Sequence, residues 1–259
     1  FTEVEESIDA GKLRLEEMEE PKKSFLDLKI AIAERILESC VLCERRCGKN
    51  RLKGELGWCQ LGVDMPVSSS FFHTGEEPEL VPSYTVFTIG CTMKCLHCQN
   101  WSISQRFEEG VVMSPKELAK EVDDARKRGA RNLNMVGGDP TSWLWNWLRV
   151  VKELKRNIPL VWNSNSYYSL ESAKLLQGFI DVYLLDFKYG RDECAVKISG
   201  APGYWEACTR NHLLAMESGE LIIRILVLPG HIECCFRPIV KWIVENLGKE
   251  TRVNVMHQY

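Results

Sequence analysis

The stretch FTIGCTMKCLHCQNWSIS, residues 87–104, places three cysteines directly behind a short apolar run. Cys91, Cys95 and Cys98 have the spacing C-x3-C-x2-C. Thiolates bind soft metals and iron–sulfur clusters, and three of them can hold three irons of a [4Fe–4S] cube. The fourth iron then keeps a position open for a substrate or a cofactor. A zinc ion needs a fourth donor, and His97 is badly placed for it because it adjoins Cys98. The loop therefore predicts a [4Fe–4S] cluster with one open iron.

The chain after residue 83 alternates between strand-like and helical patterns. A helix is expected over residues 115–128, because Ser114 and Glu117 form a capping-box pair, Pro115 takes the first helical position and Gly129 follows the end. Alternation of this kind is typical of a mostly parallel sheet. It predicts an α/β fold with a six-unit β/α barrel or partial barrel. The six expected strands are residues 84–89, 131–136, 158–163, 180–186, 221–228 and 252–257.

Active sites of β/α barrels lie at the carboxyl ends of the strands. Each expected strand ends in polar, glycine-rich or metal-binding residues, and this shared feature indicates a single site. After the three-cysteine loop of the first strand come residues 137–140 (GGDP), 163–165 (NSN), 186–188 (DFK), 229–231 (PGH) and 256–258 (MHQ).

The three-cysteine spacing at the end of a first barrel strand resembles the radical S-adenosylmethionine (SAM) superfamily. The resemblance covers about residues 84–259. It implies that the amino and carboxylate groups of SAM chelate the open iron, and that an electron from the cluster cleaves the sulfonium bond to give a 5′-deoxyadenosyl radical. The protein would position this chemistry and exclude water.

The same resemblance implies roles for residues near the loop. His97, before the last cysteine, stands where the family contacts the adenine of SAM. The turn Gly137-Gly138-Asp139 is similar to the family's Gly-Gly-Glu turn, whose backbone and acid meet the amino group of the methionine moiety. Asp139 is one methylene shorter than the usual glutamate.

A narrower likeness is to pyruvate formate-lyase activating enzymes. Asp186 and Lys188 resemble their D-x-K motif, which implies that the lysine meets the methionine carboxylate as a point charge. Asn163, Arg224 and His257 stand where that family has SAM-binding residues. Arg224 lies within an apolar strand and therefore needs a partner, which could be an acidic site or a ligand carboxylate.

A second cysteine-rich segment precedes the expected barrel. Its four thiols have the spacing C-x2-C-x3-C-x11-C and are enough to close a tetrahedral site. A structural zinc, an auxiliary [4Fe–4S] cluster and no metal at all remain open for this segment. Together with CQN at residues 98–100, it resembles a branch of proteins related to pyruvate formate-lyase activating enzyme. The four thiols belong to Cys40, Cys43, Cys47 and Cys59.

Composition restricts the remaining possibilities. The formal charge is 33 − 36 = −3 and no basic run stands out, so no nucleic-acid partner is expected. No apolar stretch approaches the roughly 20 residues that cross a membrane, and no signal peptide is visible. Eleven cysteines in such a chain favour metal binding in the cytoplasm over disulfides. Of these, Cys194, Cys208, Cys234 and Cys235 are expected to be small buried apolar residues. Cys234 and Cys235, which are adjacent and lie just after the fifth expected strand, could instead be redox-active or bind metal.

These observations predict three parts: a helical arm (1–39), a four-cysteine metal-binding segment with a linker (40–80), and a radical SAM barrel (81–259). The leading hypothesis is a radical SAM enzyme that abstracts hydrogen from a small molecule or a peptide. A glycyl-radical enzyme activase and a non-catalytic iron–sulfur electron-transfer or sensor protein are the alternatives. The enzyme would need a low-potential donor such as ferredoxin or flavodoxin.

Overall fold

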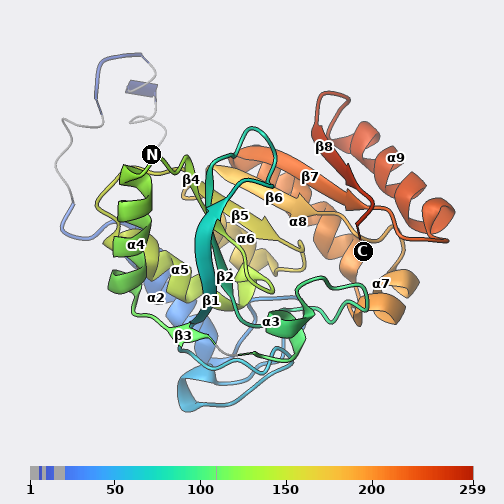
Figure 1. Cartoon of the computed structure of the whole chain (residues 1–259), viewed down its shortest axis with the longest axis horizontal. Helices are drawn as coiled ribbons and strands as arrows, with labels where there is room; N and C mark the ends of the chain where they lie inside the picture. The colour runs from blue at the N-terminus through green and yellow to red at the C-terminus, as the bar shows by residue number, and fades with distance from the viewer. Residues whose placement is uncertain (1–5, 8–9, 15–20, 109, 259) are drawn as a thin grey trace.

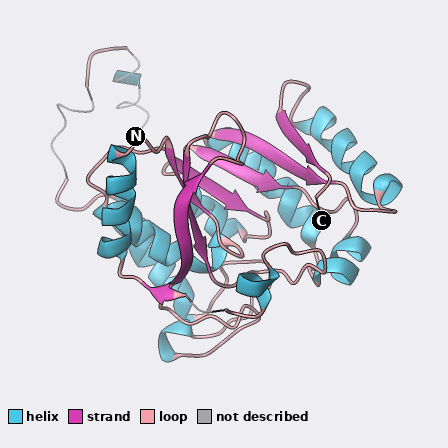
Figure 2. Cartoon of the chain, in the orientation of Figure 1, coloured by secondary structure: helices cyan, strands magenta, loops and turns pink. Residues whose placement is uncertain are grey.

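The computed structural model describes residues 6–7, 10–14, 21–108 and 110–258. Within these residues, eight strands form one sheet in the order β3-β1-β2-β4-β5-β6-β7-β8 (Figures 1 and 2). The six strands expected from the sequence are all present, and neighbours among them pair in parallel. They are β2 (Ser83–Thr88), β4 (Asn132–Met135), β5 (Leu160–Ser164), β6 (Val182–Asp186), β7 (Glu220–Leu226) and β8 (Arg252–Met256). The predicted α/β partial barrel is confirmed.

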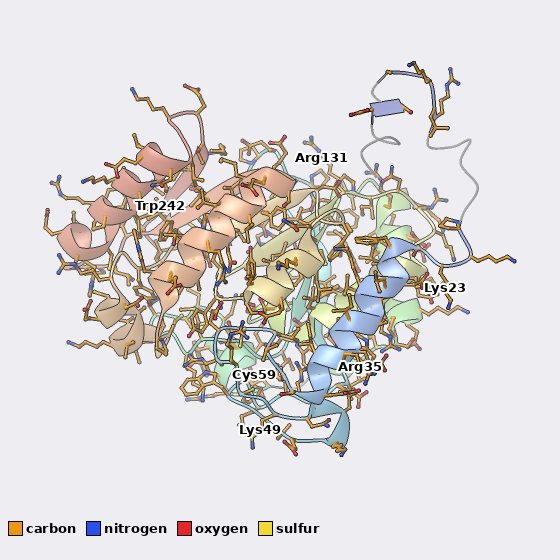
Figure 3. The ribbon with its side chains drawn as sticks, turned by 180° about the vertical axis from the view of Figure 1, so that it is seen from behind. Lys23, Arg35, Lys49, Cys59, Arg131 and Trp242 are labelled. Carbon is orange, nitrogen blue, oxygen red and sulfur yellow. The ribbon has the colours of Figure 1, made fainter. Side chains whose placement is uncertain are left out.

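Helices follow the parallel strands, as the alternation predicts. Ser114 caps α4 as expected: its hydroxyl accepts from Glu117 N at 3.3 Å, while the Glu117 carboxylate accepts from Ser114 N at 2.9 Å. The view from behind shows α2, α6, α8 and α9 lying over one side of the sheet (Figure 3). The connecting helices are α3 (Trp101–Gln105), α4 (Pro115–Lys127), α5 (Leu144–Glu153), α6 (Leu170–Leu176), α7 (Asp192–Ser199), α8 (Tyr204–Ser218) and α9 (Arg237–Asn246), with one-turn segments η3 (Pro140–Trp143) and η4 (Ile232–Phe236).

Two strands were not predicted. β1 (Pro66–His73) lies in the segment assigned to a linker and pairs antiparallel with β2, and β3 (Val111–Val112) pairs with β1. The serine run at 68–70 conceals β1, because it interrupts the apolar pattern that marks a strand. The pair covers the edge that β2 would otherwise expose. The sheet therefore begins before residue 81.

The amino-terminal helix α2 (Phe25–Glu38) agrees with the expected pattern. Ser24 caps it, and Ala33 and Leu37 are buried in the main core beside α5. Within the helical arm expected over residues 1–39, residues 1–5, 8–9 and 15–20 lie outside the described residues. None of the helices that the structure describes is both long and apolar enough to cross a membrane.

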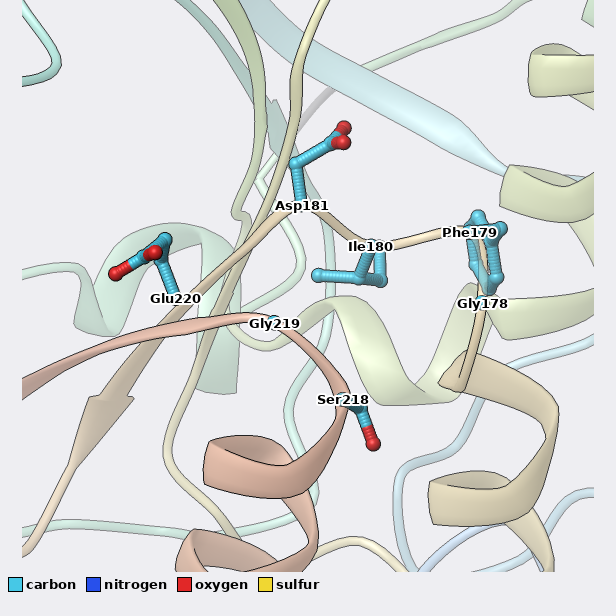
Figure 4. A pocket seen from close by; sticks show the side chains of 7 residues that line it. All are labelled: Gly178, Phe179, Ile180, Asp181, Ser218, Gly219 and Glu220. Atoms are coloured by element: carbon cyan, nitrogen blue, oxygen red, sulfur yellow. The ribbon is translucent and has the colours of Figure 1, made fainter. Parts of the chain in front are cut away.

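A surface pocket opens at the amino ends of β6 and β7, lined by residues 178–181 and 218–220 (Figure 4). The sequence places the expected chemistry at the opposite, carboxyl ends of these strands. The pocket is therefore remote from the predicted site and contributes nothing to it.

Candidate functional site

The three-cysteine loop leaves the carboxyl end of β2 and folds back under α3. Gly90 adopts a left-handed φ of 90°, and its N–H donates to Ile103 O at 2.9 Å. Cys91 and Cys95 are buried and Cys98 is half-buried. The loop is therefore fixed in position, and its thiols are shielded from solvent as a metal site requires.

Two of the loop thiols lie within hydrogen-bond distance of polar groups. Asn165 Nδ2 and Met93 N each lie 3.4 Å from Cys91 Sγ, and Ser104 Oγ lies 3.2 Å from Cys98 Sγ. Hydrogen bonds to the sulfur ligands tune the potential of iron–sulfur clusters. Burial, followed by the charges of Asp139 and Cys95, raises the pKa of Cys91 well above its usual value. A thiolate here needs a bound cation, so the donor set fits an iron–sulfur cluster.

The glycine turn after β4 packs directly on this loop. A Cβ at Gly138 would lie 2.2 Å from Gly90 O, and Gly137 has a φ of +123°. Gly138 N donates to Thr88 O at 2.9 Å, which joins the turn to the end of β2. Both glycines are needed because backbone meets backbone at this point.

Asp139 organises the end of β5. Its buried carboxylate accepts from Thr141 N at 2.9 Å, Ser164 Oγ at 2.9 Å and Asn165 N at 2.8 Å. Burial raises the pKa of Asp139, although these hydrogen bonds oppose the rise. The carboxylate thus fixes Asn165, the residue that reaches Cys91. Its expected contact with SAM stays a prediction.

Asp186 and Lys188 meet after β6, as the motif suggests. Lys188 Nζ lies 2.7 Å from Asp186 Oδ2, and only 14% and 18% of the two side chains is exposed. Burial alone would lower the pKa of Lys188, but the charges of Asp186 and Cys95 outweigh it and raise that pKa. Lys188 is therefore a buried permanent cation in the electrostatic field of Cys95.

His97 faces the same region. Its Nε2 lies 2.9 Å from the hydroxyl of Tyr189, which also bonds Ser199. Burial and the charge of Lys188 lower the pKa of His97 to about 4. The ring is therefore neutral at neutral pH, which suits a stacking contact better than an ionic one.

The other three residues expected to contact SAM are Arg224, Asn163 and His257. Arg224 finds the partner its apolar strand requires: its Nη2 lies 2.7 Å from Glu77 Oε2, and it also bonds Glu76. Asn163 is half-buried in β5, and His257 is exposed beyond β8. Their cofactor roles, like that of Arg224, stay predictions.

The four-cysteine segment converges on one cavity beside the three-cysteine loop at residues 91–98, called the radical loop below. Cys40, Cys43, Cys47 and Cys59 line this cavity together with Arg45, Arg51 and Thr92. Cys59 lies in the loop-rich lower part of the molecule (Figure 3). A Cβ at Gly57 would lie 2.5 Å from Cys47 Sγ, so glycine is needed there. The four thiols thus share a single site.

Arg45 connects the two cysteine sets. Its Nε donates to Thr92 O at 3.2 Å, and its guanidinium lies 3.8 Å from the centre of the Trp58 ring. Its buried Nη2 has no hydrogen-bond partner among the described residues. A buried cation of this kind stabilises negative charge, and the charges of both Cys43 and Cys91 act on it.

Sequence reasoning missed several residues near the site. Asn165, rather than Asn163, reaches the radical loop, and Tyr189 holds His97. Cys194, expected to be a buried apolar residue, also joins Cys234 and Cys235 around His231. The spacing H-x2-CC at residues 231–235 was the available signal for this group.

Comparison with known proteins gives an independent reading of the chain. The family model of the radical SAM superfamily matches residues 85–243. An uncharacterized protein of Methanocaldococcus jannaschii is 42% identical over 262 residues, which cover 99% of this chain and 76% of that protein.

Among solved structures, the crystal structure of Streptococcus suis SuiB bound to S-adenosylmethionine has a TM-score of 0.51 and 18% identity, covering 66% of this chain. A second SuiB crystal structure has a TM-score of 0.49 and 17% identity, covering 64% of this chain. The matches span only 39% and 37% of the SuiB chains. At 18% identity, the likeness to the SAM-bound SuiB structure shows a shared fold.

Proposed function

The chain belongs to the radical SAM superfamily, and from this premise we propose that it is an enzyme that abstracts hydrogen from an organic substrate. One observation carries the proposal. The three thiols of the radical loop are shielded at the carboxyl end of β2, where the glycine turn, Asn165 and Lys188 surround them. An electron carrier would not need these surrounding contacts.

Some residues of this chain would hold the iron–sulfur cluster, and others would position SAM. Cys91, Cys95 and Cys98 would hold three irons of a [4Fe–4S] cluster. Bound there together, the cluster and SAM supply a 5′-deoxyadenosyl radical. Lys188 would receive the methionine carboxylate, and the neutral ring of His97 would contact the adenine.

Anaerobic reconstitution tests the proposal directly. The full chain is loaded with iron and sulfide, reduced with dithionite in the presence of SAM, and assayed for 5′-deoxyadenosine by mass spectrometry. Alanine at Cys91, Cys95 or Cys98 should abolish the product. Cys208→Ala is the matched control, because Cys208 is a buried thiol outside both cysteine sets. A fully loaded wild-type protein that makes no 5′-deoxyadenosine under any reductant would leave only the electron-transfer or sensor function.

The Asp186–Lys188 pair favours a glycyl-radical enzyme activase as a second candidate within the same chemistry. The support is the likeness of this pair to the activase D-x-K motif, together with its burial beside the radical loop. Peptides carrying a glycyl-radical loop should then stimulate 5′-deoxyadenosine formation and give a radical signal by electron paramagnetic resonance. If only small molecules stimulate the reaction, the activase function is excluded.

We further propose that the four-cysteine segment holds an auxiliary [4Fe–4S] cluster. Thiolates on one zinc ion lie about 3.8 Å apart, as Zn–S bonds of about 2.3 Å require. Among the described residues, one group of three or more metal-ligating atoms lies within 4.8 Å of one another. That group follows β6 and β7 and includes none of these four cysteines. A cluster, in which each thiolate binds a different iron, does not require the four sulfurs to meet at one ion.

The position of this cluster beside Thr92 would suit electron delivery to the radical loop from a donor such as ferredoxin or flavodoxin. A Cys40→Ala/Cys43→Ala variant should lose about four irons per chain and keep the SAM-dependent signal of the radical cluster. Loss of zinc instead of iron would contradict the auxiliary cluster without touching the radical SAM function.

A further inference from the structure

Three cysteines and one histidine meet beside the candidate site, from the segments that follow two neighbouring strands. Cys194 lies in α7 after β6, whereas His231, Cys234 and Cys235 follow β7. Their ligand atoms all lie within 4.8 Å of one another. Within the described chain, no other group of three or more such atoms is found this close together. Neither cysteine set discussed above contributes to it.

Local backbone structure brings these side chains together. Residues 232–236 (η4) form a π-type turn, in which Phe236 N donates to His231 O at 3.2 Å. The wider turn allows the adjacent Cys234 and Cys235 to face the same point, and π-turns occur often at functional sites. A Cβ at Gly190 would lie 2.7 Å from Cys235 O, so this glycine lets the loop after β6 approach the turn.

Three of the six distances within this group lie near the edges of a zinc tetrahedron. Zn–S bonds of about 2.3 Å and Zn–N bonds of about 2.0–2.1 Å imply S–S edges of about 3.8 Å and S–N edges of about 3.6 Å. Cys194 Sγ lies 3.8 Å from Cys234 Sγ. His231 Nδ1 lies 3.2 Å from Cys234 Sγ and 4.0 Å from Cys235 Sγ. A disulfide would need its sulfurs at about 2.0 Å and would give the histidine no role.

We propose that Cys194, His231, Cys234 and Cys235 form a closed Cys3His zinc site. Four protein ligands leave no open position, which is the mark of a structural site. The ion would tie the loop after β6 to the loop after β7. Gly190, which packs on Cys235, adjoins Tyr189, and Tyr189 holds His97. The zinc therefore restricts the movement of Tyr189, and with it the position of the His97 ring.

Zinc content of the full chain, purified anaerobically, tests this site. To remove any contribution from the amino-terminal segment, all proteins carry Cys40→Ala and Cys43→Ala. This parent should hold about one zinc per chain, and adding Cys194→Ala or His231→Ala should abolish binding. Cys208→Ala is the matched control: Cys208 Sγ lies 3.5 Å from His212 Nδ1, but this pair has no third ligand among the residues that the structure describes. Equal zinc in the parent and in the Cys194→Ala variant would overturn the proposal.

A measurement on the wild-type chain tests the zinc site even if the variants fail to fold. Cys194, Cys234 and Cys235 should resist alkylation in the zinc-loaded protein and react after chelation, as mapped by peptide mass spectrometry. A Cys194–Cys234 disulfide in the anaerobically purified protein, or alkylation that chelation does not change, would refute the zinc site. Neither result would refute the radical SAM function, because the site shares no ligand with the radical loop.

Discussion

Replacing the two members of the Asp186–Lys188 pair, singly and together, separates their structural role from a role in binding SAM. The atoms lie 2.7 Å apart with little of either side chain exposed. At an effective dielectric constant of about 20, the attraction at this distance is about 6 kcal/mol before desolvation is subtracted. Removing one partner leaves the other charge buried and unpaired, and breaking such buried pairs costs about 3–5 kcal/mol.

We therefore expect Lys188→Met to lower the melting temperature by roughly 6–20 °C, at about 2–4 °C per kcal/mol for a chain of this size. The double variant Asp186→Asn/Lys188→Met should recover much of this loss, with a coupling free energy of about 2–3 kcal/mol. Thermal unfolding of the four proteins under anaerobic conditions measures the cycle. Additive losses would refute the stabilising ion pair.

SAM affinity should behave differently from stability in the same four proteins. An ammonium that contacts the methionine carboxylate is worth about 1.5–3 kcal/mol, so Lys188→Met should weaken SAM binding by about 10- to 150-fold. The double variant should stay weak, because it still lacks the ammonium, while its iron content stays near that of the wild type. Titration calorimetry measures the affinity. Wild-type affinity in the double variant would remove Lys188 from the SAM site.

Three further perturbations test other parts of the structure. Burial lowers the pKa of His212 to about 4. The native state therefore loses stability as the pH falls from 6.5 to 4, by on the order of 3 kcal/mol at pH 4. The variant His212→Phe should flatten this part of a pH–stability curve. Gly138→Ala should destabilise the protein by at least about 1–3 kcal/mol and lower its iron loading, whereas Gly62→Ala, where a Cβ meets open space, should change neither. Arg224→Met should cost about 3–5 kcal/mol in thermal unfolding, and Glu77→Gln added to it should restore part of that loss; an unchanged melting temperature would contradict the buried ion pair.

Local patterns predicted much of the fold and the chemistry of the radical loop. The spacing C-x3-C-x2-C indicates three ligands without any tertiary information, because all of them lie within eight residues. Alternating strands and helices likewise predict a parallel sheet, since each element forms from neighbouring residues. β1 escaped detection because its serines are polar where a strand usually shows apolar residues.

Tertiary structure alone decided which distant residues meet. Arg224 pairs with Glu77, 147 positions away, because the segment that precedes β2 reaches β7, although β4, β5 and β6 lie between these two strands in the sheet. Cys194 meets Cys234 across 40 positions, since parallel strands carry their following loops to the same edge of the sheet. The amino-acid sequence by itself determined the ligand chemistry and the layered architecture, which depend on short-range spacing. The partners of Asp139 and Arg224, and the meeting of Cys194 with the H-x2-CC run at residues 231–235, depend on strand order and register, which no local pattern encodes.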